Sequence, residues 1–259
     1  MSIHPSSVVD PAARLGAGVR IGPFCVIGPD VTLGDRVEVK SHAVVTGWTD
    51  VGADSVIFPH ATVGEVPQDL KYRGERTRLI IGARCKIRES VTLNTGTEGG
   101  GGITAVGDDC LLMTGAHVGH DARLGNRVIL ANGVAIAGHC QIGDDVIVGG
   151  LSGVHQWVRV GQGAMIGAVT MVTNDVIPYG LVQGPRGVLD GLNLVGLKRR
   201  GLDRAAISAL RHAYETLAKG DGAFQDRARR LAETAETDEV RLMAAFILSG
   251  SDRSFLTPT

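Results

Sequence analysis

Four of the chain's eight histidines fall in a short stretch, and one of them is followed directly by a carboxylate. His120 precedes Asp121, and an imidazole beside a carboxylate is suited to general base catalysis, because the pKa of an imidazole lies near neutrality at about 6.5. The other three histidines are His117, His139 and His155. They can act together only if the fold brings them to one place, so the secondary structure that carries them determines whether they form one site.

An aliphatic residue recurs every six positions over most of the chain. Twelve successive positions from Val106 to Val172 carry Ile, Leu or Val, and so do eleven from Ile3 to Val63. Six is not the helical period of about 3.6, whereas a short strand followed by a tight corner points one aliphatic side chain inward per hexad. Stacked coils of such strands bury a narrow aliphatic column, which agrees with only 4% aromatic residues and 37 glycines.

The repeat is interrupted twice and ends before the C-terminus. Residues 64–80 keep the spacing of six but place charged residues such as Asp69 at inward positions, and residues 96–103 include four consecutive glycines and shift the phase. Both segments are predicted to be loops. Near the end of the chain Asp203 can cap a helix with an apolar face. The predicted domains are a repeat domain over 1–186 and an α-helical domain over 187–259.

This pattern resembles the hexapeptide-repeat proteins, which fold as a left-handed parallel β-helix with three hexads in each coil of a three-sided prism. The left hand comes from the resemblance, since crossovers between parallel strands are normally right-handed. Residues that are three hexads apart stack directly in such a prism. His139 lies three hexads after Asp121, and Gln156 lies six hexads after His120. These four residues are therefore expected along one corner of the prism.

Zinc binding is the alternative chemistry for clustered histidines, and some hexapeptide-repeat proteins are metal-dependent carbonic anhydrases. Such a site needs three imidazoles that converge on one ion. The cluster here includes a carboxylate and a glutamine, with no cysteine or second carboxylate to complete a ligand set. No metal is therefore predicted.

Composition and charge exclude several classes of function. With 26 Lys and Arg against 27 Asp and Glu, the chain lacks the basic balance that nucleic-acid binding needs. No apolar run approaches the roughly 18 residues of a membrane span, and the first ten residues do not resemble a signal peptide. The four cysteines form no CxxC pair and are expected to be buried free thiols. The expected location is the cytoplasm, with no integral membrane segment and no nucleic-acid partner.

Seven short strings make a more specific resemblance. They are QDLKY (68–72), IRESVTL (87–93), GAHVGHD (115–121), ILAN (129–132), AGH (137–139), VHQ (154–156) and GLKRRG (196–201). Together they resemble the UDP-N-acetylglucosamine O-acyltransferases, which catalyse the first step of lipid A biosynthesis. The first and last strings are not demanded by any hexad repeat, so the resemblance extends beyond the fold class.

The resemblance implies a role for each matching residue. His120 matches a general base that takes a proton from the sugar 3-hydroxyl, Asp121 matches the group that holds the imidazole, and Gly138 matches the residue whose backbone N–H stabilises the oxyanion. The implied substrate-binding residues are Asp69, Lys71, His117, His139, His155, Gln156, Asn193 and Arg199.

The implied reaction transfers an (R)-3-hydroxyacyl chain from acyl carrier protein to the 3-position of UDP-N-acetylglucosamine. No cofactor is expected other than the phosphopantetheine of the carrier protein. The implied assembly is a homotrimer with active sites between subunits. Gly150 and Ala168, three hexads apart, match the positions that read acyl length, and alanine in place of glycine at 168 favours a shorter chain.

Two residues depart from the family pattern, and other functions stay open. Asn94 stands where the family has a histidine near the sugar, and Val195 stands where it has an acidic residue. These differences leave N-acylation of the 3-amino analogue of the sugar nucleotide as an alternative. A noncatalytic β-helix or an acetyl-CoA-dependent hexapeptide transferase is disfavoured, because neither accounts for the histidine cluster together with the helical tail.

Overall fold

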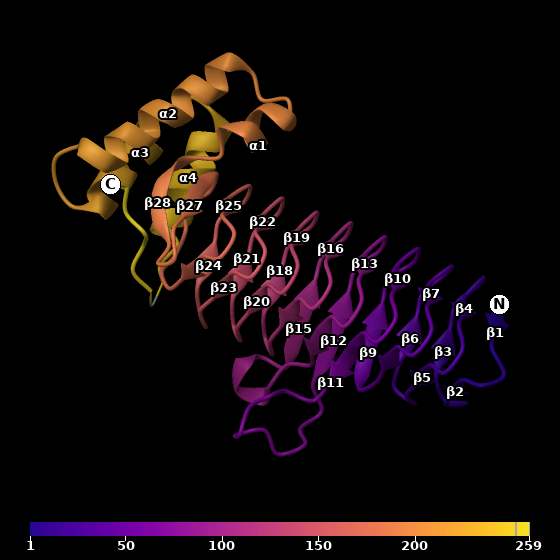
Figure 1. Ribbon diagram of the computed structural model, residues 1–259. Helices are drawn as coiled ribbons and strands as arrows, with labels where there is room; N and C mark the ends of the chain where they lie inside the picture. Colours follow the sequence, from indigo (N-terminus) through magenta and orange to yellow (C-terminus); the bar gives the residue numbers. More distant parts are fainter. Residues whose placement is uncertain (252, 259) are drawn as a thin grey trace.

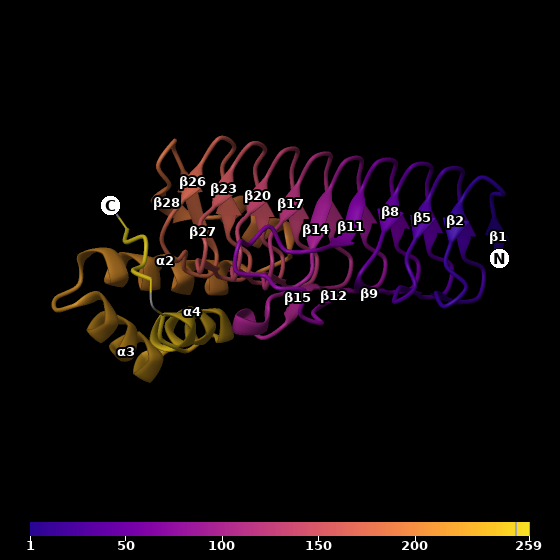
Figure 2. The same ribbon diagram turned by 90° about the horizontal axis from the view of Figure 1, so that it is seen from below.

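The strands of the chain wind into a long three-sided prism, with the N-terminus at one end and the helices at the other (Figures 1 and 2). The computed structural model describes residues 1–251 and 253–258. The strands form three sheets of 11, 9 and 8 strands, in which each strand pairs with the third strand before it and the third after it in chain order over most of the prism. That order defines a coil of three strands per turn, as the hexads predicted, and the fold is the left-handed parallel β-helix that the resemblance implied.

Each sheet forms one side of the prism. The first sheet consists of β1 (Ser2–Ile3), β4 (Arg20–Ile21), β7 (Glu38–Val39), β10 (Val56–Ile57), β13 (Lys86–Ile87), β16 (Leu111–Leu112), β19 (Ile129–Leu130), β22 (Ile147–Val148), β25 (Met165–Ile166), β27 (Gly180–Gln183) and β28 (Val188–Leu192). The second consists of β2 (Val8–Val9), β5 (Val26–Ile27), β8 (Val44–Val45), β11 (Thr62–Glu65), β14 (Thr92–Asn94), β17 (His117–Val118), β20 (Ala135–Ile136), β23 (Gly153–Val154) and β26 (Met171–Val172). The third consists of β3 (Arg14–Leu15), β6 (Thr32–Leu33), β9 (Trp48–Val51), β12 (Arg78–Ile81), β15 (Ile103–Val106), β18 (Arg123–Leu124), β21 (Gln141–Ile142) and β24 (Arg159–Val160).

The interior of the prism is the aliphatic column that the hexads predicted. Ile21 pairs with Val39, so neighbouring strands are offset by three hexads where no insertion intervenes. The inward residues Leu130, Ile136 and Ile166 are all fully buried. A buried aliphatic side chain contributes roughly 1.5–3 kcal/mol, so the stacked column is the main source of stability. The buried residues of the column are aliphatic or small, which accords with the low aromatic content.

The two interruptions are loops that project from one side of the prism (Figure 1). Ile57 pairs with Ile87, and Ile87 pairs with Leu112, so the first loop lengthens its coil by two hexads and the second by one hexad and one further residue. The first loop is shorter than the expected 64–80, because β11 continues to Glu65 and β12 begins at Arg78. The second loop contains a short 3-10 helix, η1 (Glu98–Gly100).

The C-terminal part closes the last coils and, within its described residues, adds four helices: α1 (Leu194–Arg199), α2 (Arg204–Lys219), α3 (Phe224–Thr234) and α4 (Asp238–Leu248). The expectation of helical structure from residue 187 is wrong for its first residues, because β28 pairs antiparallel with β27 and ends the first sheet. Asp203 caps α2 as predicted, since its Oδ1 accepts from Ala206 N–H at 2.7 Å. Among the helices of the described residues, none has the length and hydropathy needed to cross a membrane.

Candidate active site

Asp121, His139 and Trp157 follow one another along the corner between the second and third sheets, one coil apart. We call this edge the histidine corner. All three residues have left-handed φ values, of 60°, 62° and 67°. The backbone joins them, because His139 N–H donates to the carbonyl of His120 at 3.0 Å and Trp157 N–H donates to that of Gly138 at 3.2 Å. The spacing of three hexads thus brings Asp121 and His139 together, as the sequence predicted, and places Trp157 beside them.

His120 and Asp121 form a hydrogen-bonded pair at this corner. His120 Nδ1 lies 2.9 Å from Asp121 Oδ2, and the two residues are only 7% and 4% exposed. A carboxylate accepts but does not donate, so Nδ1 carries the hydrogen and Nε2 keeps a lone pair. The His120 ring lies beside the Asp121 carboxylate, the His139 ring and the backbone of Gly138. Nε2 is therefore placed to accept a proton.

The second loop holds the carboxylate from the other side. Thr97 donates its backbone N–H to the two oxygens of Asp121 at 2.9 and 3.1 Å, and its hydroxyl to Oδ2 at 2.6 Å. The Asp121 N–H in turn donates to the hydroxyl of Thr104 at 2.7 Å. No sequence pattern indicated Thr97, because it lies in an insertion where the repeat provides no register.

Gly138 lies against the edge of the His120 ring. A Cβ atom built at residue 138 would be 2.7 Å from Cε1 and 2.8 Å from Nε2, which is closer than real Cβ atoms approach. Among the residues that the structure describes, Gly138 N–H finds no acceptor. The corner thus combines a base nitrogen with a free backbone donor beside it, the two groups that acyl transfer needs.

Two further imidazoles flank the pair. His139 stacks on the indole of Trp157, with ring centroids 3.8 Å apart, and presents its edge to His120 at 4.9 Å. Burial lowers the pKa of His139, although the nearby Asp121 carboxylate opposes this effect. Burial also lowers the pKa of His117, with a smaller contribution from His120, and its Nδ1 lies 2.8 Å from Thr92 Oγ1. Burial therefore favours the neutral form of both flanking imidazoles.

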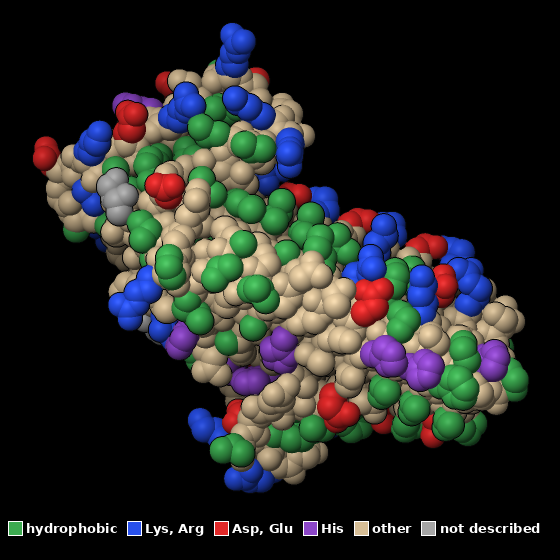
Figure 3. All heavy atoms as spheres, in the orientation of Figure 1, with side chains coloured by type: hydrophobic (Ala, Val, Ile, Leu, Met, Phe, Trp, Pro, Cys, Tyr) green, Lys and Arg blue, Asp and Glu red, His purple; other side chains and the backbone are tan. Residues whose placement is uncertain are grey.

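A cavity of about 260 Å³ lies between the two loops and the histidine corner. It is lined by Asp69, Lys71 and Tyr72 of the first loop, by Thr97 and Glu98 of the second, and by His139 and Trp157. Asp69 Oδ1 accepts from Lys71 N–H at 2.9 Å, which forms a turn in the loop. Histidine side chains are visible beside the projecting loops on this side of the prism (Figure 3). Two predicted binding residues of the first loop thus share a cavity with His139.

His155 and Gln156 lie on the next coil, closer to the helical end of the prism. Gln156 is exposed and comes just before Trp157, which stands one coil beyond His139. His155 Nδ1 lies 2.9 Å from the guanidinium of Arg253, which brings the C-terminal segment to this edge. The sequence pattern did not indicate Arg253. Trp157 could have been found from the spacing, because it lies six hexads after Asp121.

Asn193 and Arg199 do not lie at the histidine corner. They line a cavity of about 860 Å³ at a second edge, between the third and first sheets, together with Arg127 and Asp145. We call this edge the arginine corner. Asn193 begins α1, since its Oδ1 accepts from Gly196 N–H at 2.9 Å while its Nδ2 donates to the carbonyl of Gly163 at 3.0 Å. Val195, the departure noted in the sequence, is 61% exposed and lines the same cavity.

Gly150 and Ala168 stack at the third edge of the prism, where Val169 N–H donates to the carbonyl of Gly150 at 2.9 Å. The neighbouring Leu151 and Val169 are 72% and 62% exposed, so this edge is an open apolar strip. The three groups of predicted residues therefore occupy three different edges of one chain.

Asn94, the other departure from the family pattern, holds the first loop. It is 4% exposed, and its Nδ2 donates to the carbonyl of Val66 at 2.7 Å and to that of Glu65 at 3.3 Å. Its Oδ1 finds no donor within residues 1–251 and 253–258. In this chain an amide thus takes the position at the base of the loop that carries Asp69.

His120, Asp121 and His139 are also a group that could hold a metal ion. One ligating atom of each lies within 4.8 Å of the others. The Asp121 carboxylate, however, already accepts from Thr97 and His120. The absence of a functional metal stays a prediction.

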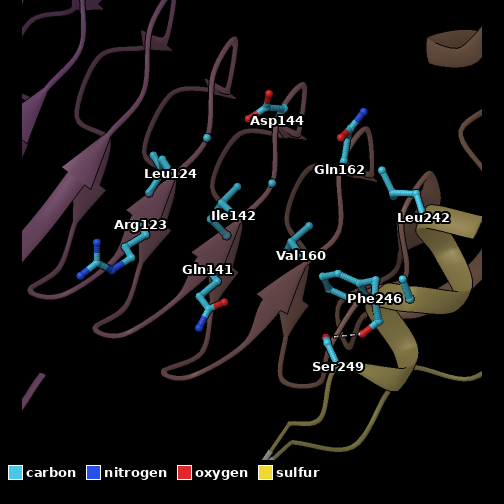
Figure 4. A pocket seen from close by; sticks show the side chains of 13 residues that line it. Arg123, Leu124, Gln141, Ile142, Asp144, Val160, Gln162, Leu242, Phe246 and Ser249 are labelled. Atoms are coloured by element: carbon cyan, nitrogen blue, oxygen red, sulfur yellow. Dashed lines mark hydrogen bonds between the residues drawn. The ribbon is translucent and has the colours of Figure 1, made fainter. Parts of the chain in front are cut away.

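Another hollow, of about 770 Å³, lies between the third sheet and α4 (Figure 4). Arg123 and Gln141 border it on the sheet, and Phe246 and Ser249 border it on the helical side. It includes no residue that the sequence predicted for the site. The chemistry is therefore concentrated at the histidine corner.

Comparison with family models defines the class of protein. The model for bacterial transferase hexapeptide (six repeats) matches residues 12–47 and 104–138. The model for domain 2 of UDP-N-acetylglucosamine O-acyltransferase matches residues 175–256. Fold and site together are those of a hexapeptide-repeat acyltransferase.

Individual relatives narrow this class. An acyl-acyl-carrier-protein–UDP-N-acetylglucosamine O-acyltransferase of Paracoccus denitrificans is 66% identical over 203 residues, which cover 78% of this chain and 77% of that protein. The enzyme of the same name from Rhizobium johnstonii is 48% identical over 258 residues, 99% of this chain and 95% of its own length. The solved UDP-N-acetylglucosamine acyltransferase from Campylobacter jejuni superposes with a TM-score of 0.94 at 36% identity, covering 99% of this chain and all of its own. The chain belongs to the family of acyl-acyl-carrier-protein–UDP-N-acetylglucosamine O-acyltransferases, as its motifs predicted.

Proposed function

We propose that the chain transfers an (R)-3-hydroxyacyl group from acyl carrier protein to the 3-hydroxyl of UDP-N-acetylglucosamine, with His120 as the general base. The observation that carries this proposal is the bond of 2.9 Å between His120 Nδ1 and Asp121, which leaves Nε2 free beside an unused backbone N–H of Gly138. Family membership supports the reaction, and this geometry supports the proposed roles of His120, Asp121 and Gly138.

The reaction follows from these groups. Nε2 takes the proton of the sugar 3-hydroxyl while its oxygen attacks the thioester carbonyl carbon. Negative charge develops on the carbonyl oxygen, which the Gly138 N–H stabilises. When the intermediate collapses, the carbon–sulfur bond breaks and the imidazolium returns its proton to the departing sulfur. The products are the sugar ester and the carrier-protein thiol. Asp121 stabilises the transient imidazolium and fixes its orientation.

The remaining predicted residues bind substrate in this scheme. Asp69 and Lys71 contact the sugar nucleotide from the first loop, and His117, His139, His155 and Gln156 line the pocket. Asn193 and Arg199 hold the uridine and phosphate end, for which a guanidinium is suited. No cofactor is required beyond the phosphopantetheine of the carrier protein. The buried free thiols of the described residues accord with a reducing compartment, and we place the reaction in the cytoplasm.

The active site is completed by a second copy of the chain. His120 and Arg199 lie at different edges of one prism, so one chain does not present both to a single substrate. A homotrimer solves this problem if the arginine corner of one protomer faces the histidine corner of its neighbour. The apolar strip beside Gly150 and Ala168 then receives the acyl chain.

The test is replacement of the base. His120→Ala is expected to lower kcat by about 10²–10⁴-fold, because it removes the proton acceptor, while the oligomer and its thermal midpoint persist. The control is His42→Ala, which removes another corner histidine that packs on the rings of Phe24 and His60. The assay offers UDP-N-acetylglucosamine and its 3-amino analogue in competition, with hydroxyacyl carrier proteins of several chain lengths. Parent-level turnover by the His120→Ala variant rules out His120 as the base. Exclusive acylation of the 3-amino analogue shows that the reaction is N-acylation and not O-acylation.

A further inference from the structure

We infer that Thr97 is a positioning residue of the reaction, which fixes the carboxylate of Asp121 so that the carboxylate can orient His120. This inference rests on the proposed function of His120 as the base. Thr97 donates its hydrogen bonds to Asp121 and not to His120, so its effect on turnover passes through the carboxylate.

The hydrogen bonds of Asp121 come mainly from Thr97. The backbone N–H of Thr97 bridges both carboxylate oxygens, and its hydroxyl donates to Oδ2 at 2.6 Å. His120 Nδ1 binds that same Oδ2 at 2.9 Å. Hydrogen bonds on both sides of Oδ2 fix the rotation of the carboxylate, which otherwise has a broad preference about its last torsion. The side chain of Asp121 is 1% exposed, so its hydrogen bonds come from the surrounding protein and not from bulk solvent.

The second loop is shaped around this carboxylate. A Cβ atom at Gly96 would lie 2.8 Å from Asp121 Oδ1, and one at Gly100 would overlap the carboxylate. Thr97 is itself held by the loop, because its hydroxyl accepts from Gly100 N–H at 3.2 Å and its carbonyl accepts from Gly102 N–H at 2.8 Å. The glycines thus allow the loop to lie directly on Asp121, and Thr97 is its point of attachment.

A purely structural role is the competing explanation, because Thr97 also caps η1. The two explanations differ in their dependence on Asp121. A positioning residue has no effect once the carboxylate is gone, whereas loss of a structural cap lowers turnover by the same factor with or without Asp121. A double-mutant cycle measures this difference.

The experiment compares Thr97→Val, Thr97→Ser, Asp121→Ala and the Thr97→Val/Asp121→Ala double variant of the full-length protein, with UDP-N-acetylglucosamine and hydroxyacyl carrier protein. Thr97→Val is expected to lower kcat by about 10- to 100-fold, the range for a lost hydrogen bond to a charged group, while KM for the sugar nucleotide changes by less than about threefold. Thr97→Ser keeps the hydroxyl and is expected to retain kcat within about threefold. In the Asp121→Ala background, Thr97→Val is expected to change kcat by less than about twofold.

Parent-level kcat in Thr97→Val, or an equal loss in both backgrounds, overturns the inference. Thr97→Ala serves in the same cycle if the valine variant does not fold, as judged by thermal unfolding. His120→Ala, assayed in parallel, distinguishes failure of the proposed base from failure of the role of Thr97. If it stays active, the proposed base is wrong. If it is inactive while Thr97→Val is normal, only the role of Thr97 is wrong.

Discussion

The requirement for glycine at residue 138 comes from the neighbouring imidazole of His120 and not from the backbone. The position does not have a left-handed φ, so an alanine could adopt its conformation. The obstacle is the ring of His120, whose Cε1 and Nε2 lie within 2.8 Å of where a Cβ would be. Glycine at this position therefore leaves room for the His120 ring beside the backbone of residue 138.

Gly138→Ala is expected to lower kcat by about 10-fold or more while the coil stays folded, because the ring must rotate away from its bond to Asp121. The control is Gly153→Ala, at a position on β23 where the new methyl group meets only the flexible end of Met171, at 3.2 Å. Steady-state kinetics of both variants, with thermal unfolding, check this expectation. Equal kcat values for the two variants contradict it.

The site residues that obey the repeat could be predicted from their spacing, whereas the loop residues Asp69 and Lys71 were predicted only through the resemblance, and Thr97 was predicted by neither. His139 follows from its distance to Asp121 alone, because neighbouring coils are offset by three hexads. Trp157 obeys the same spacing. Thr97 lies in an insertion between two coils, where no periodic signal relates a loop residue to the corner that it touches. Only the folded loop shows that contact.

Among the elements of the prism, the interior and the corners contribute to stability in different ways. Along the arginine corner, guanidinium and carboxylate groups of successive coils form bidentate pairs: Arg36 with Asp54, Arg84 with Asp109, and Arg127 with Asp145. These arginine side chains are more than half exposed, so water and salt screen the pairs. The inward aliphatic side chains are buried, so water does not replace their contacts when they are removed.

Leu112→Ala is expected to lower the free energy of unfolding by about 2–5 kcal/mol, because it leaves a cavity in the fully buried column. Arg84→Ala, on the same stretch of the prism, is expected to cost less than about 1 kcal/mol. Denaturant unfolding at one fixed protein concentration measures both values, since oligomer stability depends on concentration. A larger loss for Arg84→Ala, or one that does not shrink in high salt, argues that the corner pairs dominate.

The bounds of the loops and strands show which features of the fold the sequence pattern could predict and which it could not. The first loop could be predicted, because charged residues at inward positions such as Asp69 cannot join an aliphatic column. The strand β28 could not be predicted, since a short run with Val and Leu is compatible with a helix or a strand. Its conformation is set by β27, with which it pairs, and so by tertiary contacts.

At the scale of the molecule, the helical part is fastened to the prism by a buried ion pair. Arg159 on β24 donates from Nε to Asp175 Oδ2 at 2.7 Å and from Nη1 to Ser249 Oγ, just beyond α4, at 2.8 Å. Asp175 is fully buried and also binds the backbone of the C-terminal segment at Ser254 and Leu256. Loss of one partner leaves an uncompensated buried charge, so this cluster holds the helices in a fixed position relative to the coils.

That fixed position makes a site shared between protomers possible, and mixing two inactive variants tests it. His120→Ala and Arg199→Ala are each expected to lose activity as homo-oligomers. When equal amounts are refolded together, about one quarter of the interfaces in a randomly assembled trimer pair an intact His120 with an intact Arg199 of the neighbour. About one quarter of the parent kcat is therefore expected, whereas the double variant mixed with itself recovers none.

Recovery in the mixture cannot come from either chain alone, because each lacks one of the two groups. If His120 and Arg199 served the same site within one chain, the mixture would be as inactive as its components, and the separation of the histidine and arginine corners would need another explanation. The same experiment with His120→Ala and Asp121→Ala provides the contrast. Those two side chains lie 2.9 Å apart in one chain, so mixing them restores nothing.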